Sequence, residues 1–159
     1  MLYNKIMVPL DGSELAECVM PHVEAITTGC KITNVVFALV VNPVQLPVSV
    51  PARGEFSFTE TERQQLYEQH KQAAEAYLKR MVASTRLEGV VLSYEVLEGK
   101  VADALARWAE KNGVDLIVIA SHGRSGVSRW VMGSVAERVL RSACVPVLMV
   151  RAPGCSPGI

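Results

Sequence analysis

Five short apolar segments alternate along the chain with longer segments that mix apolar and polar residues. The apolar segments lie near residues 4–10, 34–41, 90–97, 114–120 and 146–150. Continuous apolar runs of this length are typical of strands buried on both faces of a parallel sheet. Strands that alternate with helices predict an open α/β fold with right-handed crossovers.

Apolar residues at helical spacing predict the helices between these strands. The first helix is expected to begin at about Ser13 and to bury the residues Leu15, Val19, Met20, Val23 and Ile26. A later helix carries the apolar residues Val101, Leu105, Ala106 and Trp108. This later helix is expected to stop at Asn112-Gly113, because glycine allows a left-handed C-terminal cap.

A further helix is predicted to begin near Thr59, because Thr59 and Glu62 have the spacing of a capping box. Its inward residues are expected to be Leu66, Tyr67, Ala74, Tyr77 and Met81. The proline-rich residues 43–58 before it are predicted to form a long insertion, either mobile or folded over a ligand site. Residues 152–159 are predicted to be a disordered tail, which leaves residues 1–151 as one domain.

Length and charge narrow the classes of function. The chain has 159 residues, enough for one domain, and its 16 basic side chains balance 16 acidic ones. No cluster of Lys and Arg is present, so neither nucleic acid nor an anionic membrane is an expected partner. The apolar runs have strand length and the start lacks a signal-peptide pattern, so we expect a cytoplasmic protein. The four cysteines show no Cys-x-x-Cys spacing, and no structural zinc site is expected.

One loop in the last third of the chain has the features of an anion-binding junction between a strand and a helix. Residues 120–123 read Ala-Ser-His-Gly, nine residues follow, and then comes Gly133-Ser134. Ser134 and Glu137 are spaced as a capping box. Glycine lets an anionic group approach the backbone, and the N–H groups and dipole of a helix start favour negative charge. The alternative is a tight loop that needs glycine only for its turns.

The start of the chain has a second junction of this kind. Residues 5–14 predict a strand, a sharp turn and the start of a helix. Ligands of open α/β sheets bind beyond the carboxyl ends of the strands, where strand order reverses, so Asp11 and the Gly123 loop could face one another. The Asp11 carboxylate could accept hydrogen bonds from ribose hydroxyls or help to hold a metal ion. Equally, it could cap the first helix, with Ser13 as a rival cap.

Together these segments resemble the universal stress protein family over nearly the whole chain. The matching features are Pro-x-Asp-x-Ser at residues 9–13, Leu-Val-Val-Asn-Pro at residues 39–43, and the Gly-x-x-Gly, nine residues, Gly-Ser signature. The resemblance implies an open five-stranded parallel sheet with helices on both faces and strand order 3-2-1-4-5. This sheet is Rossmann-like and similar to that of the adenine nucleotide alpha hydrolases. One branch of the family binds ATP, and another branch lacks the glycine signature and does not.

The resemblance to the ATP-binding branch implies nucleotide contacts for particular residues of this chain. Asp11 matches the position at the ribose, Pro9 lines the adenine pocket, and the backbone of Val40 reads the adenine edge. Without the resemblance, Val40 would be interpreted as a core residue. The phosphate positions match Gly123, Gly133 and Ser134, with Ala120, His122, Arg124 and Val135 beside them. Ala120 stands where the signature has its first glycine, and its methyl group is expected to narrow the approach to the sugar and first phosphate.

Motifs of enzymes that use nucleotides or an activated serine are incomplete. Gly99-Lys100 lacks the upstream glycine of a Walker loop, and no Gly-x-Gly-x-x-Gly follows the first strand. Residues 123–126, Gly-Arg-Ser-Gly, are one residue short of a nucleophile elbow. The sequence identifies no general base near the terminal phosphate, so at most slow ATP hydrolysis is expected.

The sequence and the resemblance together predict an ATP-binding or adenine-nucleotide-binding protein with a role in stress sensing or signalling. Mg²⁺ is expected to screen the phosphates of the nucleotide. The alternatives are a slow ATPase or nucleotidyl-transferring enzyme, and a nucleotide-free module that acts through dimerisation. The family resemblance implies a homodimer through the strand at residues 146–150, which is apolar on both faces and lies at a sheet edge.

Overall fold

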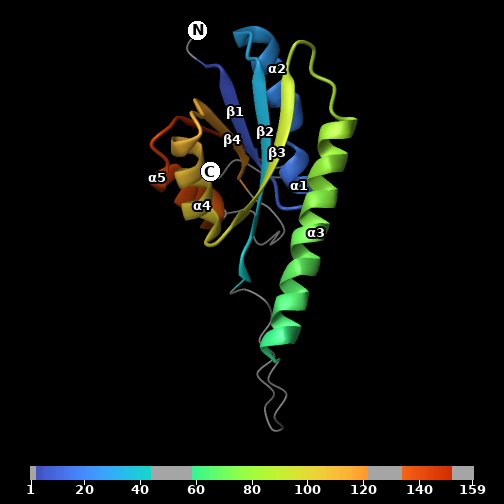
Figure 1. The fold of residues 1–159 in the computed structure, drawn as a ribbon. Coiled ribbons are helices and arrows are strands. Elements are labelled where there is room, and N and C mark those ends of the chain that lie inside the picture. The colour runs from blue at the N-terminus through green and yellow to red at the C-terminus, as the bar shows by residue number, and fades with distance from the viewer. Residues whose placement is uncertain (1–2, 44–58, 122–133, 152–159) are drawn as a thin grey trace.

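Five parallel strands form one sheet in the order β3-β2-β1-β4-β5 (Figure 1). The strands are β1 (Lys5–Pro9), β2 (Asn34–Val41), β3 (Val91–Glu98), β4 (Leu116–Ala120) and β5 (Val147–Val150). The computed structural model describes residues 3–43, 59–121 and 134–151 of the chain. The predicted number, positions and order of the strands are confirmed.

Helices cover both faces of this sheet (Figure 1). One face carries α1 (Glu14–Glu17), α2 (Met20–Cys30) and α3 (Glu60–Ser84), and the other carries α4 (Val101–Lys111) and α5 (Ser134–Ser142). Neighbouring strand residues divide between two apolar clusters, because successive side chains of a strand point to opposite faces. Val8 and Phe37 pack in the cluster under α1, α2 and α3, whereas Met7 and Val36 pack under α4 and α5.

The first helix is interrupted, whereas the apolar spacing predicts one helix from Ser13. α1 ends at Glu17, and α2 begins at Met20 with Pro21 in its first turn. Proline has no N–H and its ring clashes with the carbonyl group four residues earlier, so it fits the first turn of a helix but not the middle. The break places Pro21 where it is tolerated. Val19 and Val23 are still fully buried, as predicted.

The helix α3 is longer than the strands on which it packs and extends beyond the sheet (Figure 1). Its predicted capping box is present: Thr59 Oγ1 accepts from Glu62 N at 3.3 Å, and Glu62 Oε2 accepts from Thr59 N at 2.7 Å. The buried residues of α3 are Ala74 and Leu78, while the predicted inward residues Leu66, Tyr67, Tyr77 and Met81 are half-buried. The buried residues of α3 therefore lie in its second half, and its first residues, 60–65, are exposed.

The helix α4 ends at the predicted left-handed glycine. Gly113 has a φ of 63°, and Val114 N donates to the carbonyl oxygen of Ala109 at 3.0 Å. This reversal returns the chain to the sheet, where Asp115 Oδ2 accepts from Asn4 N at 2.8 Å and from Lys5 N at 2.9 Å. The start of β4 is thereby fixed to the start of β1.

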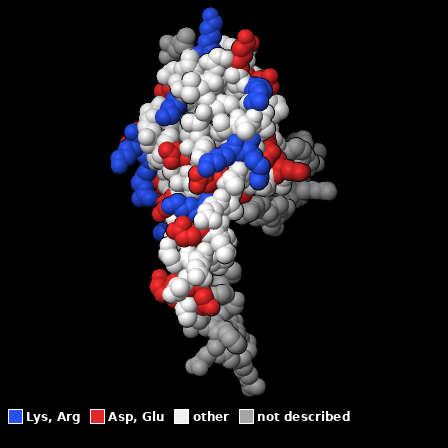
Figure 2. All heavy atoms as spheres, turned by 45° about the vertical axis from the view of Figure 1, so that its right-hand side comes forward, with Lys and Arg blue, Asp and Glu red and all other residues white. Residues whose placement is uncertain are grey.

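Acidic and basic side chains are mixed on the face that carries α3 (Figure 2). Lys71 Nζ lies 3.0 Å from Glu98 Oε1, and Lys79 Nζ lies 2.7 Å from Glu75 Oε1. In the described ranges, no helix combines the length and the apolar character needed to cross a bilayer. Residues 44–58 of the predicted insertion and the predicted tail at 152–159 lie outside the described residues.

Candidate functional site

The turn after β1 is held by hydrogen bonds among its own side chains. Asp11 Oδ1 accepts from Ser13 N at 3.0 Å and from Ser13 Oγ at 2.6 Å. Ser13 is the N-cap of α1, and its Oγ accepts from Ala16 N at 3.2 Å. Gly12 between them has a φ of 84°, a region in which a Cβ is strained. The capping role therefore belongs to Ser13, and Asp11 braces the turn.

The Asp11 turn lies where the strand order of the sheet reverses. β1 has β2 on one side and β4 on the other. The chain therefore leaves β1 toward β2 and leaves β4 toward β5, in opposite directions along the sheet. α1 follows β1 onto one face, and α5 follows β4 onto the other. Pro9 is the buried last residue of β1, Ala120 is the last residue of β4, and Ser121 follows it; Ala120 and Ser121 have 6% and 5% of their surface exposed. Strand ends at such a reversal form the crevice in which open α/β sheets bind ligands.

Val40 directs its backbone toward the same strand reversal. In β2, Asn34 N donates to Asn4 O, and Ala38 O accepts from Leu10 N at 2.8 Å, so the even-numbered residues bond toward β1. Val40 is the next residue in this alternation, one step beyond the end of β1. Its half-buried side chain packs in the cluster under α4 and α5. Val40 is therefore a core residue by its side chain, and its amide and carbonyl groups point toward the strand reversal.

The start of α5 supplies the remaining described part of the predicted site. α5 returns from the end of β4 to the start of the parallel strand β5, so its first residues lie at the carboxyl edge of the sheet. Ser134 and Val135 are both exposed there. Ser134 is already helical and Glu137 pairs with Arg141 at 2.9 Å, so the predicted capping box is absent from the described hydrogen bonds.

The predicted phosphate positions are only partly described. The residues His122, Gly123, Arg124 and Gly133 lie outside the described residues. Their assignment remains a prediction from the sequence. The structure brings Pro9, Asp11 and the backbone of Val40 to adjoining strand ends beside Ala120, at the edge where α5 begins.

Two residues that sequence reasoning did not assign to the site lie next to the Asp11 turn. The Tyr77 hydroxyl of α3 donates to Glu17 Oε1, at the end of α1, at 2.8 Å. Burial, this hydrogen bond and the negative charge of Asp11 together raise the pKa of Tyr77. The spacing of α3 predicts that Tyr77 faces inward, but no local signal pairs it with a residue sixty positions earlier.

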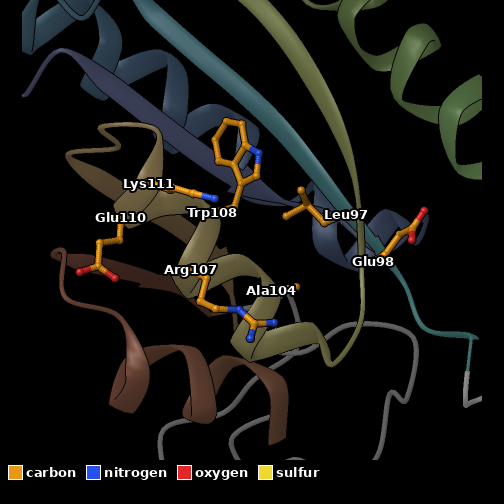
Figure 3. Close-up of a pocket in the computed structure, with 7 residues that line it drawn as sticks. All are labelled: Leu97, Glu98, Ala104, Arg107, Trp108, Glu110 and Lys111. Carbon is orange, nitrogen blue, oxygen red and sulfur yellow. The ribbon is translucent and has the colours of Figure 1, made fainter.

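A separate hollow lies on the α4 side of the sheet (Figure 3). Its volume is ≈ 470 Å³, and its lining comes from α4 and the end of β3: Leu97, Glu98, Ala104, Arg107, Trp108, Glu110 and Lys111. Lys5 Nζ lies 5.1 Å from the centroid of the Trp108 ring, near the hollow. No residue of the predicted nucleotide site lines this hollow, so we do not assign the nucleotide to it.

Comparison with known proteins gives one consistent result. The profile of the universal stress protein family matches residues 2–151. Universal stress protein MJ0531 of Methanocaldococcus jannaschii is 35% identical over 152 residues, which cover 96% of this chain and 84% of the relative. The solved structure of MJ0577 has a TM-score of 0.80 at 28% identity, over 97% of this chain and 99% of the other.

Two further solved structures contain adenine nucleotides. A universal stress protein in complex with cAMP has a TM-score of 0.57 at 21% identity, over 96% of this chain and 99% of the other. A universal stress protein family protein from Arabidopsis thaliana with AMP bound has a TM-score of 0.63 at 13% identity, over 95% and 93%. At these identities, the likeness establishes a shared fold.

Proposed function

The chain belongs to the universal stress protein family, and from this membership we propose that it binds ATP or a related adenine nucleotide between the ends of β1 and β4. The observation that supports the proposal most directly is the braced Asp11 turn beside the end of β4, where strand order reverses. Fold neighbours that contain cAMP and AMP support the choice of an adenine nucleotide.

Each described site residue has a role suited to its chemistry. The Asp11 carboxylate accepts hydrogen bonds from ribose hydroxyls, since an ionised carboxylate has two oxygens that act only as acceptors. The amide and carbonyl groups of Val40 pair with the polar edge of adenine, and Pro9 lies beneath the ring. The phosphates lie at Gly123, Gly133 and the first N–H groups of α5, which have no acceptor within the helix.

Mg²⁺ would take most of its ligands from the nucleotide. In the described part of the chain, no group of three or more His, Cys, Asp or Glu residues is arranged to hold a metal ion. Mg²⁺ characteristically keeps several waters and binds through phosphates and one or two carboxylates. Asp11 is the nearest carboxylate that follows β1, and the cation would screen the phosphates from it.

We infer that the protein senses or signals stress as a homodimer, with β5 at the interface. β5 is a sheet edge, since among the described strands it pairs only with β4. Leu148 on this strand is 37% exposed, whereas Val150 is buried. An apolar edge strand favours pairing with another chain, and pairing of β5 with its copy across a two-fold axis would cover it.

The nucleotide proposal is tested with the purified full chain. Native mass spectrometry should detect a co-purified adenine nucleotide, and calorimetry should detect ATP binding. Gly133→Val should abolish binding, because a Cβ would occupy the path of the phosphate oxygens. The matched control is Gly29→Val in α2, where an added Cβ meets no atom within 4 Å. A folded Gly133→Val variant with unchanged ATP affinity would overturn the assignment.

The same sample separates the two alternative functions. ATP turnover of about one per second or faster would indicate an enzyme, since enzymes commonly reach this rate. A dimer without bound nucleotide and without measurable ATP affinity would indicate a nucleotide-free interaction module. Binding with slow or absent turnover is the result that the proposal predicts.

A further inference from the structure

The helix α1, which follows the Asp11 turn, is too short to be stable without contacts to the rest of the molecule. α1 has 4 residues, and isolated helices shorter than about 12 residues are marginal in water. Its start is fixed by the bonds between Asp11 and Ser13, and Ala16, with 5% of its surface exposed, packs in the core. The orientation of the Asp11 turn therefore depends also on the contacts at the other end of α1, where Val19 is buried and Glu17 is hydrogen-bonded.

Tyr77 makes that attachment. Its hydroxyl donates to Glu17 Oε1 at 2.8 Å, in a partly buried position, and Glu17 is the last residue of α1. A hydrogen bond to an ionised carboxylate is roughly twice as strong as one between neutral groups. The bond joins α1 to a helix that lies sixty residues later in the chain.

Tyr77 is itself held in place by the packing of α3. Leu78, its neighbour in sequence, is fully buried, and Ala74 is 6% exposed. Leu78 belongs to the same apolar cluster as Ala16 and Val19, and the Tyr77 side chain packs against this cluster. α1 and α3 thus share a core beneath the hydroxyl–carboxylate contact. A displacement of the Asp11 turn along α1 would reach α3 through that contact.

The charges around Tyr77 agree with such a role. Burial, the bond to Glu17 and the charge of Asp11 raise the pKa of the Tyr77 phenol, and the charge of Arg80 acts against this rise. Two carboxylates therefore lie near the hydroxyl, one bonded to it and one in the turn. Tyr77 is placed to respond to changes at the turn.

We propose that Tyr77 is a positioning residue for the nucleotide site: through Glu17 it fixes α1 and the Asp11 turn, and it couples occupancy of that turn to α3. This inference rests on the proposed nucleotide function of the same turn. Coupling between two sites is reciprocal, so a ligand that tightens the turn also tightens α3, and a partner that holds α3 raises the affinity for the ligand. A partner that binds α3 would then distinguish the nucleotide-bound protein from the nucleotide-free protein.

The chain offers a matched control for the test. The Tyr94 hydroxyl of β3 donates to Glu75 Oε1 of α3 at 3.3 Å, also in a partly buried position. Tyr77→Phe and Tyr94→Phe remove the same kind of bond from the same helix, but only the first bond reaches α1. We expect Tyr77→Phe to weaken ATP binding by about fivefold, and Tyr94→Phe to change it by less than about twofold.

Two further measurements distinguish coupling from a general loss of stability. ATP should slow amide hydrogen exchange at residues 74–82 in the parent chain and in Tyr94→Phe, but not in Tyr77→Phe. The effect of Tyr77→Phe on affinity should also disappear in a chain that carries Glu17→Ala, because that chain already lacks the acceptor of the Tyr77 hydrogen bond. The double-mutant cycle cancels the effect of the Glu17 charge itself.

Equal losses of affinity in Tyr77→Phe and Tyr94→Phe would overturn the inference, as would wild-type affinity in Tyr77→Phe. Failure of the parent chain to bind ATP would instead refute the proposed function. In that case, amide hydrogen exchange measured without nucleotide tests whether Tyr77 fixes α1. Amides 12–18 should exchange faster in Tyr77→Phe than in Tyr94→Phe, and equal rates would refute the role of Tyr77.

Discussion

Replacement of Ala120 by glycine should lower stability without lowering nucleotide affinity. Ala120 stands where the family signature has glycine, at the carboxyl end of β4 and opposite Val150 of β5. Its methyl group is 6% exposed and packs in the cluster that contains Leu10 and Ala16. The methyl group therefore supports the core beneath the Asp11 turn, and in the proposed site it also narrows the approach of the nucleotide.

The loss of stability in Ala120→Gly follows from these contacts. Removing a buried group of this size costs about 0.8 kcal/mol of unfolding free energy, and glycine in a strand costs about 0.5–1 kcal/mol more. We expect a decrease of about 1.5 kcal/mol, which lowers the Tm by roughly 3–6 °C in a domain of this size. Urea unfolding measures the change directly. ATP affinity, measured by calorimetry, should stay equal or increase.

A control and a second variant make this prediction decisive. Ala38→Gly removes a methyl group from a fully buried position in β2, so it should lose comparable stability without any gain in affinity. Ala120→Val should weaken binding, because the added methyl groups narrow the approach of the nucleotide further, and their overpacking should also cost about 1–3 kcal/mol of unfolding free energy. The reasoning would be refuted if Ala120→Val bound ATP with wild-type affinity. It would also be refuted if Ala120→Gly lost affinity in proportion to its loss of stability.

Three further predictions concern other parts of the molecule. Leu148→Glu should convert the proposed dimer to a monomer in light scattering, whereas Val91→Glu, on the exposed opposite edge, should leave its mass unchanged; a Leu148→Glu dimer would exclude this interface. Thr59→Ala should speed amide hydrogen exchange in the first turn of α3, because it removes about 1 kcal/mol of capping free energy. Thr61→Ala, at an exposed position, should not change this exchange, and equal exchange in both variants would count against the cap. Lys79 holds the pKa of Glu75 below its ordinary value of 4.5, so the pair stabilises the fold above that pH and stops doing so as the pH falls through the lowered pKa. Lys79→Met should therefore reduce stability slightly at pH 7, and in urea unfolding this loss should shrink as the pH falls through the lowered pKa of Glu75, whereas a loss that does not change with pH would contradict the assignment.

The strands β1, β2, β4 and β5 could be predicted because their sequences are almost entirely apolar. In the central strands, residues on both sides are buried, as in Ile117 and Val118 of β4, whereas residues of the edge strand β3 are mostly exposed or half-buried. The apolar spacing does not reveal the break between α1 and α2, because it continues through the break, with Val19 and Val23 both buried. Pro21 was the signal for a break, since proline is excluded from helix interiors but fits a first turn.

The strand ends of the candidate site could be predicted for a different reason. Asp11, Val40 and Ala120 each follow or end a strand, and topology brings the carboxyl ends of parallel strands to one edge. The contact between Glu17 and Tyr77 could not be predicted, because it depends on how two helices pack across the core. Tertiary contacts of this kind leave no periodic pattern in the sequence.

The candidate site forms only when β4 has paired with β1. Asn4 N and Asp115 Oδ2 are bonded across 111 residues, so the two sides of the crevice are synthesised far apart in time. Pairing across such a separation closes a long loop and is slow compared with local helix formation. A nascent or truncated chain that ends before β4 has an Asp11 turn but no crevice. A nucleotide that binds the crevice would stabilise only chains that have completed folding, and it would select them from incomplete ones by mass action.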